Sequence, residues 1–350
     1  MRSTVKVLVV DDSALTRQLL TRALSVDPSI EVVGTAKTGV DAIEKCHQLR
    51  PDVVTLDIEM PELTGIEALP HIIRTTPARV VMLSAVDDSD TTYQALSLGA
   101  TDFILKPAGG FASSLSELSE ILIKKIKTAY RVLPERRVVA RAPGSAEPER
   151  VRKSPSRHGT TFDRVVVVAS STGGPPALET VFSGLGSDLS ATYVIIQHLP
   201  AGFTESLAKR LGRVTDLEVA TARDGDRIEQ GVVYIAPHGS HTQVAGRSTP
   251  RIRLQDAPAV HGVRPAADPT FESVVERFGD RTVGVVLTGM GTDGTNGLAA
   301  VVRAGGETIV QDEQTSVVWG MPGAAVKAGV AQRVVPLESI AAEIRRSIRR

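Results

Sequence analysis

Acidic residues follow two apolar runs in the first part of the chain. Asp11 and Asp12 come directly after residues 5–10, and Asp57 comes after residues 53–56. Clustered carboxylates repel one another unless a hard cation offsets their charge, and Mg²⁺ binds a few carboxylates together with water and phosphate oxygens. Beside such a cation, the Asp57 carboxylate could attack a phosphoryl donor and form an acyl phosphate. The residues therefore predict a phosphoryl-accepting site with Mg²⁺ bound by Asp11, Asp12 and Asp57.

Two further polar residues lie where later apolar runs end. Lys106 follows residues 102–105 and could offset the charge of a phosphoryl group, whereas Ser84 ends the run 80–84 and could hydrogen-bond a phosphoryl oxygen. Each residue alone has a simpler explanation, because acidic residues at strand ends often cap turns and surface lysines are common. Their shared position at strand ends favours one common site.

A second set of polar residues follows the apolar runs 165–169, 193–197 and 283–287. In chain order they are Ser171, His198 and Asp293. A serine hydroxyl is a weak nucleophile at neutral pH and needs a base; an imidazole can be that base when a carboxylate orients it. The second half of the chain therefore predicts a serine hydrolase.

The turn that contains Ser171 reads Ser-Ser-Thr-Gly-Gly-Pro. Its glycines allow a close approach of the backbone, and a helix that begins at Pro175 or Pro176 would favour developing negative charge at the turn. A phosphate could also bind there, although the turn matches neither the dinucleotide-binding spacing nor the P-loop. It also differs from the Gly-x-Ser-x-Gly nucleophile elbow. By itself, this motif is weak support for a nucleophile.

Other residues compete for the same roles. Ser170 is a second hydroxyl, which we expect to cap or pack at the end of the strand. The residues themselves do not decide between His198 and the imidazoles of three predicted loops, His238, His241 and His261.

Short β-branched runs alternate with helical patterns in both halves of the chain. This alternation predicts an α/β protein with two doubly wound, mainly parallel-sheet domains. The strands expected in the first half are 5–10, 31–35, 53–56, 80–84 and 102–105, and its helical patterns fall within 15–24, 42–49, 66–73, 93–98 and 115–130. The second half should contain strands 165–169, 193–197, 232–236, 283–287 and 308–310, helices 176–185, 203–211, 269–278, 294–304 and 337–348, and a hairpin of 242–245 with 251–254 that turns near Gly246. Ligands bind beyond the carboxyl ends of such strands, so both sets of polar residues lie at binding edges.

The stretch between these halves has a different composition. Residues 131–160 contain four prolines, eight Lys or Arg residues against three acids, and no hydrophobic period. We therefore predict a flexible linker over residues 126–160. It separates a first domain at residues 4–125 from a second at residues 161–350.

Composition excludes several classes of protein. Forty basic and forty acidic residues balance, so no overall field favours nucleic acid or an anionic membrane surface. No apolar run approaches the ~18 residues of a membrane span, and the N-terminus lacks the pattern of a signal peptide. The single cysteine, Cys46, fits a reducing compartment. We expect a cytoplasmic protein without membrane insertion and without a nucleic-acid partner.

Residues 4–125 resemble the response-regulator receiver domain. The matching stretches are Val9-Val10-Asp11-Asp12-Ser13, Leu56-Asp57-Ile58-Glu59-Met60-Pro61 with Gly65, Leu83-Ser84-Ala85 and Lys106-Pro107. The resemblance implies a flavodoxin-like fold and phosphorylation of Asp57 by a histidine kinase with Mg²⁺. It also implies that Ser84 and Lys106 contact the phosphoryl group and that Phe103 is the switching aromatic residue.

Residues 163–345 resemble the catalytic domain of the protein-glutamate methylesterases of bacterial chemotaxis, the CheB family. The matching stretches are Ser171-Thr172-Gly173-Gly174-Pro175, Gln197-His198-Leu199-Pro200 with Gly202-Phe203-Thr204, Tyr234-Ile235-Ala236-Pro237, Arg264-Pro265, Leu287-Thr288-Gly289-Met290-Gly291-Thr292-Asp293-Gly294 and Gly320-Met321-Pro322. The resemblance implies a Rossmann-like fold, a Ser171–His198–Asp293 triad and an oxyanion hole at Met290 and Thr172. We expect the esterase reaction to need no cofactor.

Together the two resemblances imply a phosphorylation-activated enzyme of a two-component chemosensory pathway. It would hydrolyse glutamyl methyl esters on the cytoplasmic helices of methyl-accepting chemoreceptors, and it would also deamidate receptor glutamines, as many members of the family do. The alternative is a catalytically weak signalling scaffold that binds receptors. A transcriptional regulator is disfavoured because the second half lacks a basic recognition helix.

Overall fold

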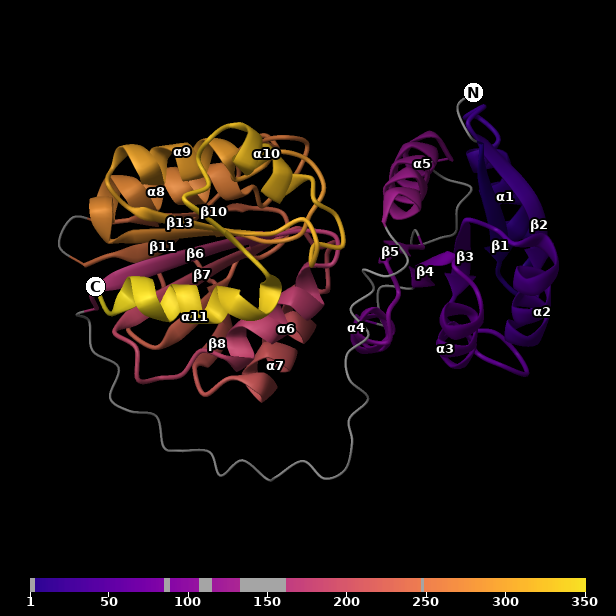
Figure 1. Ribbon diagram of the computed structural model, residues 1–350, viewed down its shortest axis with the longest axis horizontal. Helices are drawn as coiled ribbons and strands as arrows, with labels where there is room; N and C mark the ends of the chain where they lie inside the picture. Colours follow the sequence, from indigo (N-terminus) through magenta and orange to yellow (C-terminus); the bar gives the residue numbers. More distant parts are fainter. Residues whose placement is uncertain (1–3, 85–88, 107–114, 133–161, 247–248) are drawn as a thin grey trace. The chain divides into compact units, whose positions relative to one another are not determined.

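The computed structural model describes residues 4–84, 89–106, 115–132, 162–246 and 249–350. The chain divides into two compact units, Met1–Ala142 and Pro143–Arg350 (Figure 1). Most of the predicted linker, residues 133–160, lies outside the described residues.

The first unit is a five-stranded parallel sheet with the order β2-β1-β3-β4-β5. Its strands are β1 (Val5–Val10), β2 (Ile30–Ala36), β3 (Val53–Asp57), β4 (Arg79–Ser84) and β5 (Asp102–Leu105). Its helices are α1 (Ala14–Leu24), α2 (Gly39–Leu49), α3 (Gly65–Thr75), α4 (Ser89–Ser97) and α5 (Leu115–Arg131). The strand order reverses between β1 and β3, and this confirms the predicted flavodoxin-like fold.

Alternating residues of β1 build the core beneath two helices. Val5, Val7 and Val9 are buried together with apolar residues of α1 and α5. Because the apolar stripe of α5 continues through Ile126 and Ala129, the helix reaches Arg131. The predicted domain boundary at residue 125 therefore falls inside α5.

The second unit contains a seven-stranded parallel sheet with the order β14-β13-β12-β6-β7-β9-β8, together with the antiparallel pair β10-β11. The strands are β6 (Arg164–Ser170), β7 (Ala191–Gln197), β8 (Glu218–Thr221), β9 (Val232–Ile235), β10 (His241–Ala245), β11 (Arg251–Gln255), β12 (Thr282–Val286), β13 (Glu307–Gln311) and β14 (Arg333–Val335). The helices are α6 (Gly174–Ser183), α7 (Thr204–Val214), α8 (Ala267–Phe278), the 3₁₀ helix Gly279–Arg281, α9 (Thr295–Arg303), α10 (Met321–Lys327) and α11 (Leu337–Ile348). The predicted doubly wound fold is confirmed for this unit as well.

Helices cover both faces of this sheet (Figure 1). Helices α8, α9 and α10 lie on one face, and α6, α7 and α11 lie on the other. On the first face, Val165 and Val167 of β6 share one buried cluster with Phe271 of α8 and Leu298 of α9. This packing holds α8 and α9 against the strand that leads to Ser171.

Besides the 3₁₀ helix Gly279–Arg281, three elements were not predicted. The strands β8 and β14 are short edge strands with partly exposed residues, so they lack the apolar run of a central strand. Helix α10 contains Pro322 and Gly323, both of which are poor helix formers. In addition, His241 is the first residue of β10 instead of a loop residue. Across the described ranges, every helix falls short of the length and apolarity that a membrane span requires.

Candidate active site and phosphoryl-accepting site

The predicted acidic site of the first unit lies beyond the carboxyl ends of β1 and β3. Carboxylate oxygens of Asp11, Asp12 and Asp57 all lie within 4.8 Å of one another. The ammonium of Lys106, which follows β5, lies 2.9 Å from Asp11 Oδ2 and 2.6 Å from Asp57 Oδ2. The structure thus brings four of the predicted residues together, with the all-oxygen donor set that suits Mg²⁺.

Asp57 is only 3% exposed. Burial raises the pKa of its carboxyl group to about 7, and the charges of Asp11 and Asp12 act in the same direction, while Lys106 opposes them. Burial lowers the pKa of Lys106, but its pairing with Asp57 and Asp11 outweighs burial and raises it. A single ammonium therefore leaves the Asp57 carboxylate incompletely stabilised, and a divalent cation at this position would favour its ionised form.

Ser84 and Phe103, the two other residues expected to take part in the response to phosphorylation, are buried in β4 and β5. The Ser84 hydroxyl lies 2.5 Å from the Thr92 hydroxyl of α4. Phe103 of β5 lies beside Met82 of β4, and the Lys125 ammonium lies 5.5 Å from the centroid of its ring. Ser84 thus connects the end of β4 to α4.

The second site lies at the carboxyl ends of the three adjacent strands β12, β6 and β7. The strand order reverses between β6 and β12, where ligands bind in such sheets. Backbone hydrogen bonds join the three strand ends: Ser171 N donates to Thr288 O at 3.0 Å, and His198 N donates to Ser170 O at 3.1 Å. The predicted nucleophile, base and orienting acid therefore share one edge.

The two neighbouring serines have different surroundings. Ser170 is fully buried, and its hydroxyl donates to Gln197 Oε1 at 2.6 Å. Ser171 is half-buried and precedes Gly173, whose φ of 76° lies in the left-handed region. Helix α6 begins directly after that glycine, so the Ser171 turn lies at the positive end of a helix dipole.

The loop after β12 packs directly on Ser171. A Cβ atom at Gly289 would lie 2.8 Å from Ser171 Cβ, so a larger residue at this position would push the loop away. The Thr288 hydroxyl donates to Thr172 O at 2.9 Å and accepts from Val318 N at 2.9 Å. Met290 follows Gly289 in this loop and is half-buried. Thr172 is buried beside Ser171.

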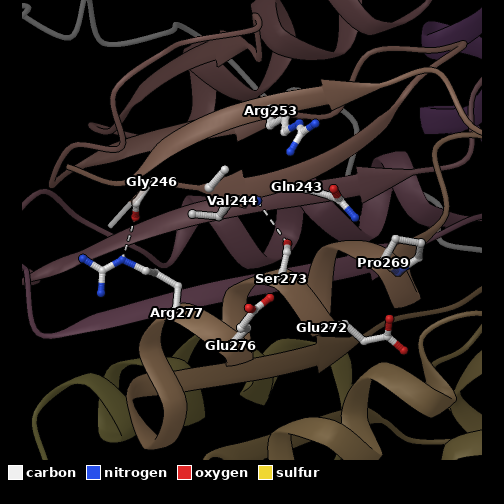
Figure 2. A pocket seen from close by; sticks show the side chains of 10 residues that line it. Gln243, Val244, Gly246, Arg253, Pro269, Glu272, Ser273, Glu276 and Arg277 are labelled. Carbon is white, nitrogen blue, oxygen red and sulfur yellow. Dashed lines mark hydrogen bonds between the residues drawn. The ribbon is translucent and has the colours of Figure 1, made fainter. Parts of the chain in front are cut away.

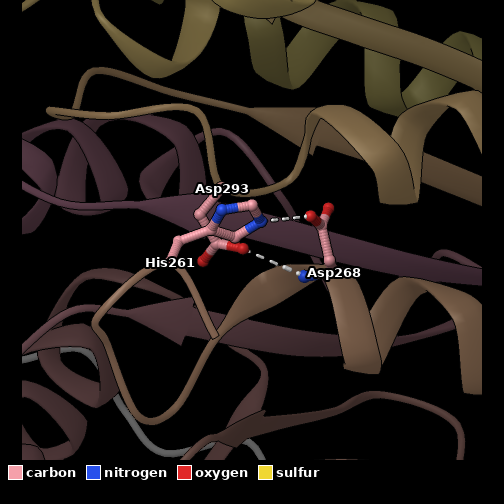
Figure 3. Close-up of side chains that lie close together, drawn as sticks. All are labelled: His261, Asp268 and Asp293. Carbon is pink, nitrogen blue, oxygen red and sulfur yellow. Dashed lines mark hydrogen bonds and ion pairs between the residues drawn. The ribbon is translucent and has the colours of Figure 1, made fainter. Parts of the chain in front are cut away.

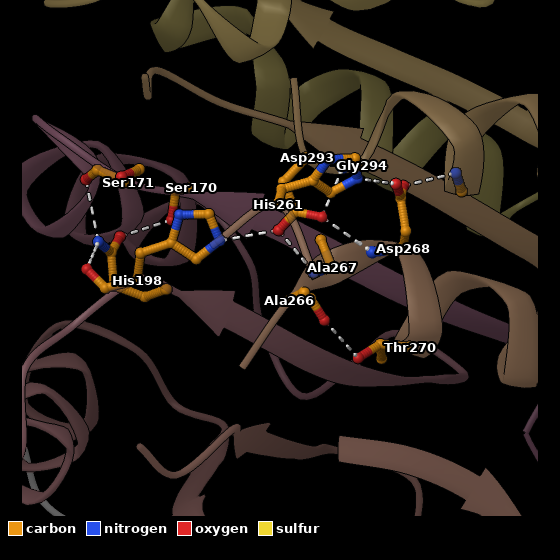
Figure 4. A network of polar contacts seen from close by, with 12 residues as sticks. Ser170, Ser171, His198, His261, Ala266, Ala267, Asp268, Thr270, Asp293 and Gly294 are labelled. Atoms are coloured by element: carbon orange, nitrogen blue, oxygen red, sulfur yellow. Dashed lines mark hydrogen bonds and ion pairs between the residues drawn. The ribbon is translucent and has the colours of Figure 1, made fainter. Parts of the chain in front are cut away.

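His198 is bonded to Asp293. Its Nε2 lies 2.8 Å from Asp293 Oδ2, and Figure 4 shows the imidazole between Ser171 and Asp293 in that view. Because an ionised carboxylate can only accept, Nε2 carries the proton. The unprotonated ring nitrogen is therefore Nδ1, and Nδ1 is the atom that can accept a proton from a nucleophile.

Asp293 is 2% exposed. Burial raises the pKa of its carboxyl group, but the hydrogen bond and charge of His198 and the backbone N–H groups of Ala267 and Asp268 outweigh burial and lower it. These backbone bonds measure 2.7 Å from Ala267 and 3.2 Å from Asp268. Asp293 thus stays ionised and can orient the imidazole.

Comparison with known proteins finds a matching family for each half of the chain. A family model of the CheB methylesterase matches residues 166–344, and a model of the response regulator receiver domain matches residues 7–112. The chain belongs to the CheB methylesterase family. It is 45% identical over 340 residues to the protein-glutamate methylesterase/protein-glutamine glutaminase of Pyrococcus horikoshii, covering 96% of this chain and 91% of that protein.

Two further relatives support membership of this family. The protein-glutamate methylesterase/protein-glutamine glutaminase of Symbiobacterium thermophilum is 45% identical over 353 residues, covering 98% of this chain and 97% of that protein. The crystal structure of the Thermotoga maritima CheB methylesterase catalytic domain superposes with a TM-score of 0.52 at 38% identity, covering 52% of this chain and 97% of that one.

The other histidines within residues 162–246 and 249–350 have different partners. His238 Nδ1 lies 2.8 Å from Leu199 O. Buried His241 accepts from Ala266 N through Nδ1 at 3.1 Å, and its Nε2 lies 3.0 Å from Pro258 O. His261 is bonded to Asp268. His198 is therefore the imidazole that hydrogen-bonds Asp293.

A groove between α8 and the β10-β11 hairpin is lined by none of Ser171, His198 and Asp293 (Figure 2). Arg277 Nε donates to Gly246 O at 3.1 Å, and Ser273 Oγ accepts from Val244 N at 3.0 Å. The lining includes the acids Glu272 and Glu276 as well as basic side chains. Its mixed charge does not indicate a class of ligand.

The sequence did not reveal the residues that hold Asp293. The predicted start of α8 was Pro269, but the helix begins at Ala267, and Ala267 and Asp268 supply two of the N–H donors to Asp293. The one available signal was the absence of a capping side chain before this helix, because Ala266 occupies the N-cap position.

Proposed function

We propose that this chain is a protein-glutamate methylesterase that uses Ser171, His198 and Asp293 and is activated by phosphorylation of Asp57. The observation that carries the proposal is the His198–Asp293 hydrogen bond of 2.8 Å at the strand edge that also bears the Ser171 turn. A scaffold without chemistry would not need an ionised, buried acid bonded to an imidazole at this place.

We infer the acylation step from this arrangement. Ser171 Oγ attacks the carbonyl carbon of a γ-glutamyl methyl ester, and His198 Nδ1 takes the hydroxyl proton. The tetrahedral intermediate then breaks its bond to the methoxy oxygen, which receives the proton from Nδ1 and leaves as methanol. An ester between Ser171 and the glutamyl side chain remains.

Deacylation repeats the same proton movements with water. His198 Nδ1 takes a proton from water as the water oxygen attacks the acyl carbon. The bond between the acyl carbon and Ser171 Oγ then breaks, and Oγ receives the proton from Nδ1. The product is a glutamate side chain. Glutamine would enter the same sequence with ammonia as the leaving group, in keeping with the glutaminase activity named for the relatives.

The oxyanion of each tetrahedral intermediate needs hydrogen-bond donors. We assign this role to Met290 and Thr172. Two contacts support this assignment. Gly289 packs against Ser171, and the hydrogen bond from the Thr288 hydroxyl to Thr172 O holds the two loops together. The N-terminus of α6 adds favourable electrostatic potential at the same turn.

In the receiver unit, Asp57 accepts a phosphoryl group from a histidine kinase. Asp11, Asp12 and Asp57 would hold Mg²⁺, which offsets the charge of the carboxylates and the incoming phosphoryl group. Lys106 already contacts Asp57 and would contact the phosphoryl group. Ser84 and Phe103 would respond to phosphorylation through β4, β5 and α4.

The substrates in this proposal are methylated glutamyl residues on the cytoplasmic helices of methyl-accepting chemoreceptors, and the protein acts in the cytoplasm. We infer that the receiver domain begins at residue 4 and extends beyond the predicted residue 125 to the end of α5 at Arg131. The linker follows to residue 160, and the methylesterase domain covers residues 161–350.

Methanol release from methylated receptor membranes tests this function. We expect release from the intact chain to rise with a small phosphodonor and Mg²⁺. The rise should disappear in Asp57→Ala, and release should disappear in Ser171→Ala. The matched control is Ser170→Ala, which removes the neighbouring hydroxyl and should keep most of the activity.

The scaffold alternative makes the opposite prediction. If neither the intact chain nor its fragment 160–350 released methanol from receptors of its own organism, the protein would bind receptors without hydrolysing them. A phosphodonor effect that persisted in Asp57→Ala would instead remove the receiver from the mechanism.

A further inference from the structure

Two adjacent helices of the methylesterase unit begin without a capping side chain of their own. Ala266 precedes α8 and Gly294 precedes α9, and neither position offers a side-chain acceptor to its helix. The first N–H groups of any helix have no partner within that helix. Acceptors for these groups must therefore come from outside the helix itself.

Each helix receives its acceptor from the other one. Asp293, which lies just before α9, accepts from Ala267 N and Asp268 N in the first turn of α8. Asp268 in turn accepts from Gly297 N of α9 at 2.7 Å. The helices also approach closely, because a Cβ atom at Gly297 would lie 2.5 Å from Phe271 Cβ. Asp268 and Asp293 thus form a reciprocal pair of caps.

His261 adds a second imidazole to this pair. Its Nε2 lies 2.7 Å from Asp268 Oδ2 (Figure 3). His261 and Gly262, with φ of 54° and 75°, are the central residues of a tight turn closed by hydrogen bonds between Val260 and Val263. A positive φ at both central residues defines a turn in which Asn-Gly is preferred. The turn holds the imidazole against Asp268.

A metal site is the other explanation for this cluster. Ligand atoms of His261, Asp268 and Asp293 lie within 4.8 Å of one another. However, the two oxygens of Asp293 already accept four hydrogen bonds, from His198 Nε2 and from three backbone N–H groups. A carboxylate has about four acceptor positions, so a metal would have to displace one of these donors. The arrangement fits a hydrogen-bond network better.

We propose that Asp268 and His261 are positioning residues that hold Asp293, and through it His198, in the geometry required for ester hydrolysis. This inference rests on the proposed function. Neither residue contacts the reacting atoms: Asp268 acts through its N–H bond to Asp293 and its cap on α9, and His261 acts through Asp268. Loss of either should lower kcat and leave KM nearly unchanged, because the substrate-binding surface is not altered.

Asp268→Ala leaves Gly297 N without its acceptor. We expect kcat to fall about tenfold to hundredfold, in line with the effect of small displacements of catalytic groups. Asp268→Asn keeps a carbonyl oxygen for Gly297 N and should restore much of kcat. His261→Asn keeps a residue favoured in this turn and removes the imidazole, so it should lower kcat by a few-fold without lowering Tm.

The matched control is Glu272→Ala. Glu272 lies on α8 and its side chain is exposed, so its loss should alter neither kcat nor KM. The kinetics are measured on the full-length protein with methylated receptor membranes and the phosphodonor present.

A second readout does not depend on the esterase activity. The proton on His198 Nε2, bonded to a buried carboxylate, should give a downfield proton NMR signal that disappears in His198→Gln. We expect the signal to shift or broaden in Asp268→Ala and His261→Asn and to stay in place in Glu272→Ala. If receptors were not hydrolysed at all while this pattern held, the proposed function would fail and the positioning role would stand.

Three results would overturn the proposal. One is an unchanged kcat in both Asp268→Ala and His261→Asn. Another is an increase in KM that accounts for the whole loss of kcat/KM. The third is an unchanged His198 signal in both variants. If Asp268→Ala does not fold, His261→Asn carries the same test, and Asp268→Asn remains the variant expected to keep much of kcat.

Discussion

Asp57 and Asp293 occupy equivalent places in the two units and behave in opposite ways. Each is almost fully buried and lies at the carboxyl end of a parallel sheet, next to the point where the strand order reverses. Yet the pKa of Asp57 is raised by burial to about 7, whereas that of Asp293 is lowered by its hydrogen bonds. Burial alone therefore does not determine the charge of a strand-end carboxylate.

The difference lies in the hydrogen-bond donors. Asp293 accepts from an imidazole and from three backbone N–H groups, whereas Asp57 is paired with Lys106 and has two other carboxylates nearby. Fixed donors stabilise an ionised acid permanently, as is required for orienting a base. A site with like charges and one ammonium instead depends on an added cation, which suits a group that must be switched.

The largest expected effect follows from removing the charge of Asp293. Asp293→Asn should lower kcat for ester hydrolysis by about 10³- to 10⁴-fold, because the amide cannot stabilise the imidazolium of His198 or hold the same tautomer. Methanol release under saturating phosphodonor measures this effect, with Ser171→Ala as the floor. A loss below tenfold would mean that His198 does not depend on Asp293.

Removing the charge of Asp57 should act through regulation. In Asp57→Asn we expect the ratio of methanol release with and without phosphodonor to fall to about one, because the amide cannot form an acyl phosphate. The matched comparison is Asp52→Asn, a change at a carboxylate of the receiver that lies outside the acidic cluster. If Asp52→Asn abolished activation equally, the loss in Asp57→Asn would not report on the phosphoryl site.

Stability should depend on pH in opposite ways at the two acids. The pKa of Asp57 in the folded chain, about 7, lies above its ordinary value of 3.8. The folded state therefore keeps a proton that the unfolded state releases, and this group lowers stability as pH rises from about 4 to 7. The pKa of Asp293 is lowered, so its contribution is present above the unfolded pKa and is lost as pH falls below it.

Denaturant unfolding of the full chain in Mg²⁺-free buffer tests this contrast. As pH rises from 4 to 8, Asp57→Asn should become progressively more stable relative to the unsubstituted chain. Asp293→Asn should instead be more destabilising at pH 8 than at a pH below the unfolded pKa of 3.8. Parallel pH dependence of the two variants would show that the donors around Asp293 do not offset its burial.

A third carboxylate should show the smallest effect. Asp27 pairs with Lys127 and accepts from Ser29, and these bonds lower its pKa to about 2. Its contribution to stability is present above the unfolded pKa near 3.8 and is lost as pH falls through about 2. Both side chains are partly exposed, so Lys127→Met should cost only about 0.5 kcal/mol at pH 7. Thermal unfolding at pH 7 in low and high salt measures it, and a cost that salt does not reduce would contradict a screened ion pair.

Sequence patterns predicted the central strands well because central strands are continuous β-branched runs buried on both faces. Residues such as Val165 to Ala169 carry that signal directly. The edge strands β8 and β14 escaped prediction because their side chains are partly exposed, which leaves no apolar run to detect. Helix α10 escaped because Pro322 and Gly323 lie in its first turn.

Strand ends also predicted which polar residues would meet. They predicted that Ser171, His198 and Asp293 would lie at the edge shared by β6, β7 and β12, but they did not decide between His198 and the other three histidines. The ring nitrogen that His198 uses, and the caps exchanged by Asp268 and Asp293, could not be predicted. The exchanged caps depend on the distance between α8 and α9, which side-chain packing sets and sequence spacing does not encode.

The exchange of caps between α8 and α9 ties catalysis to the local opening of the fold. Proteins open in cooperative segments whose free energies can lie well below that of global unfolding. When the first turn of α8 frays, Asp293 loses two of its donors and α9 loses the acceptor for Gly297, so both helix ends open as one segment. This local opening leaves the seven-stranded sheet intact but inactivates the enzyme. We therefore expect activity to decline on heating before the chain unfolds.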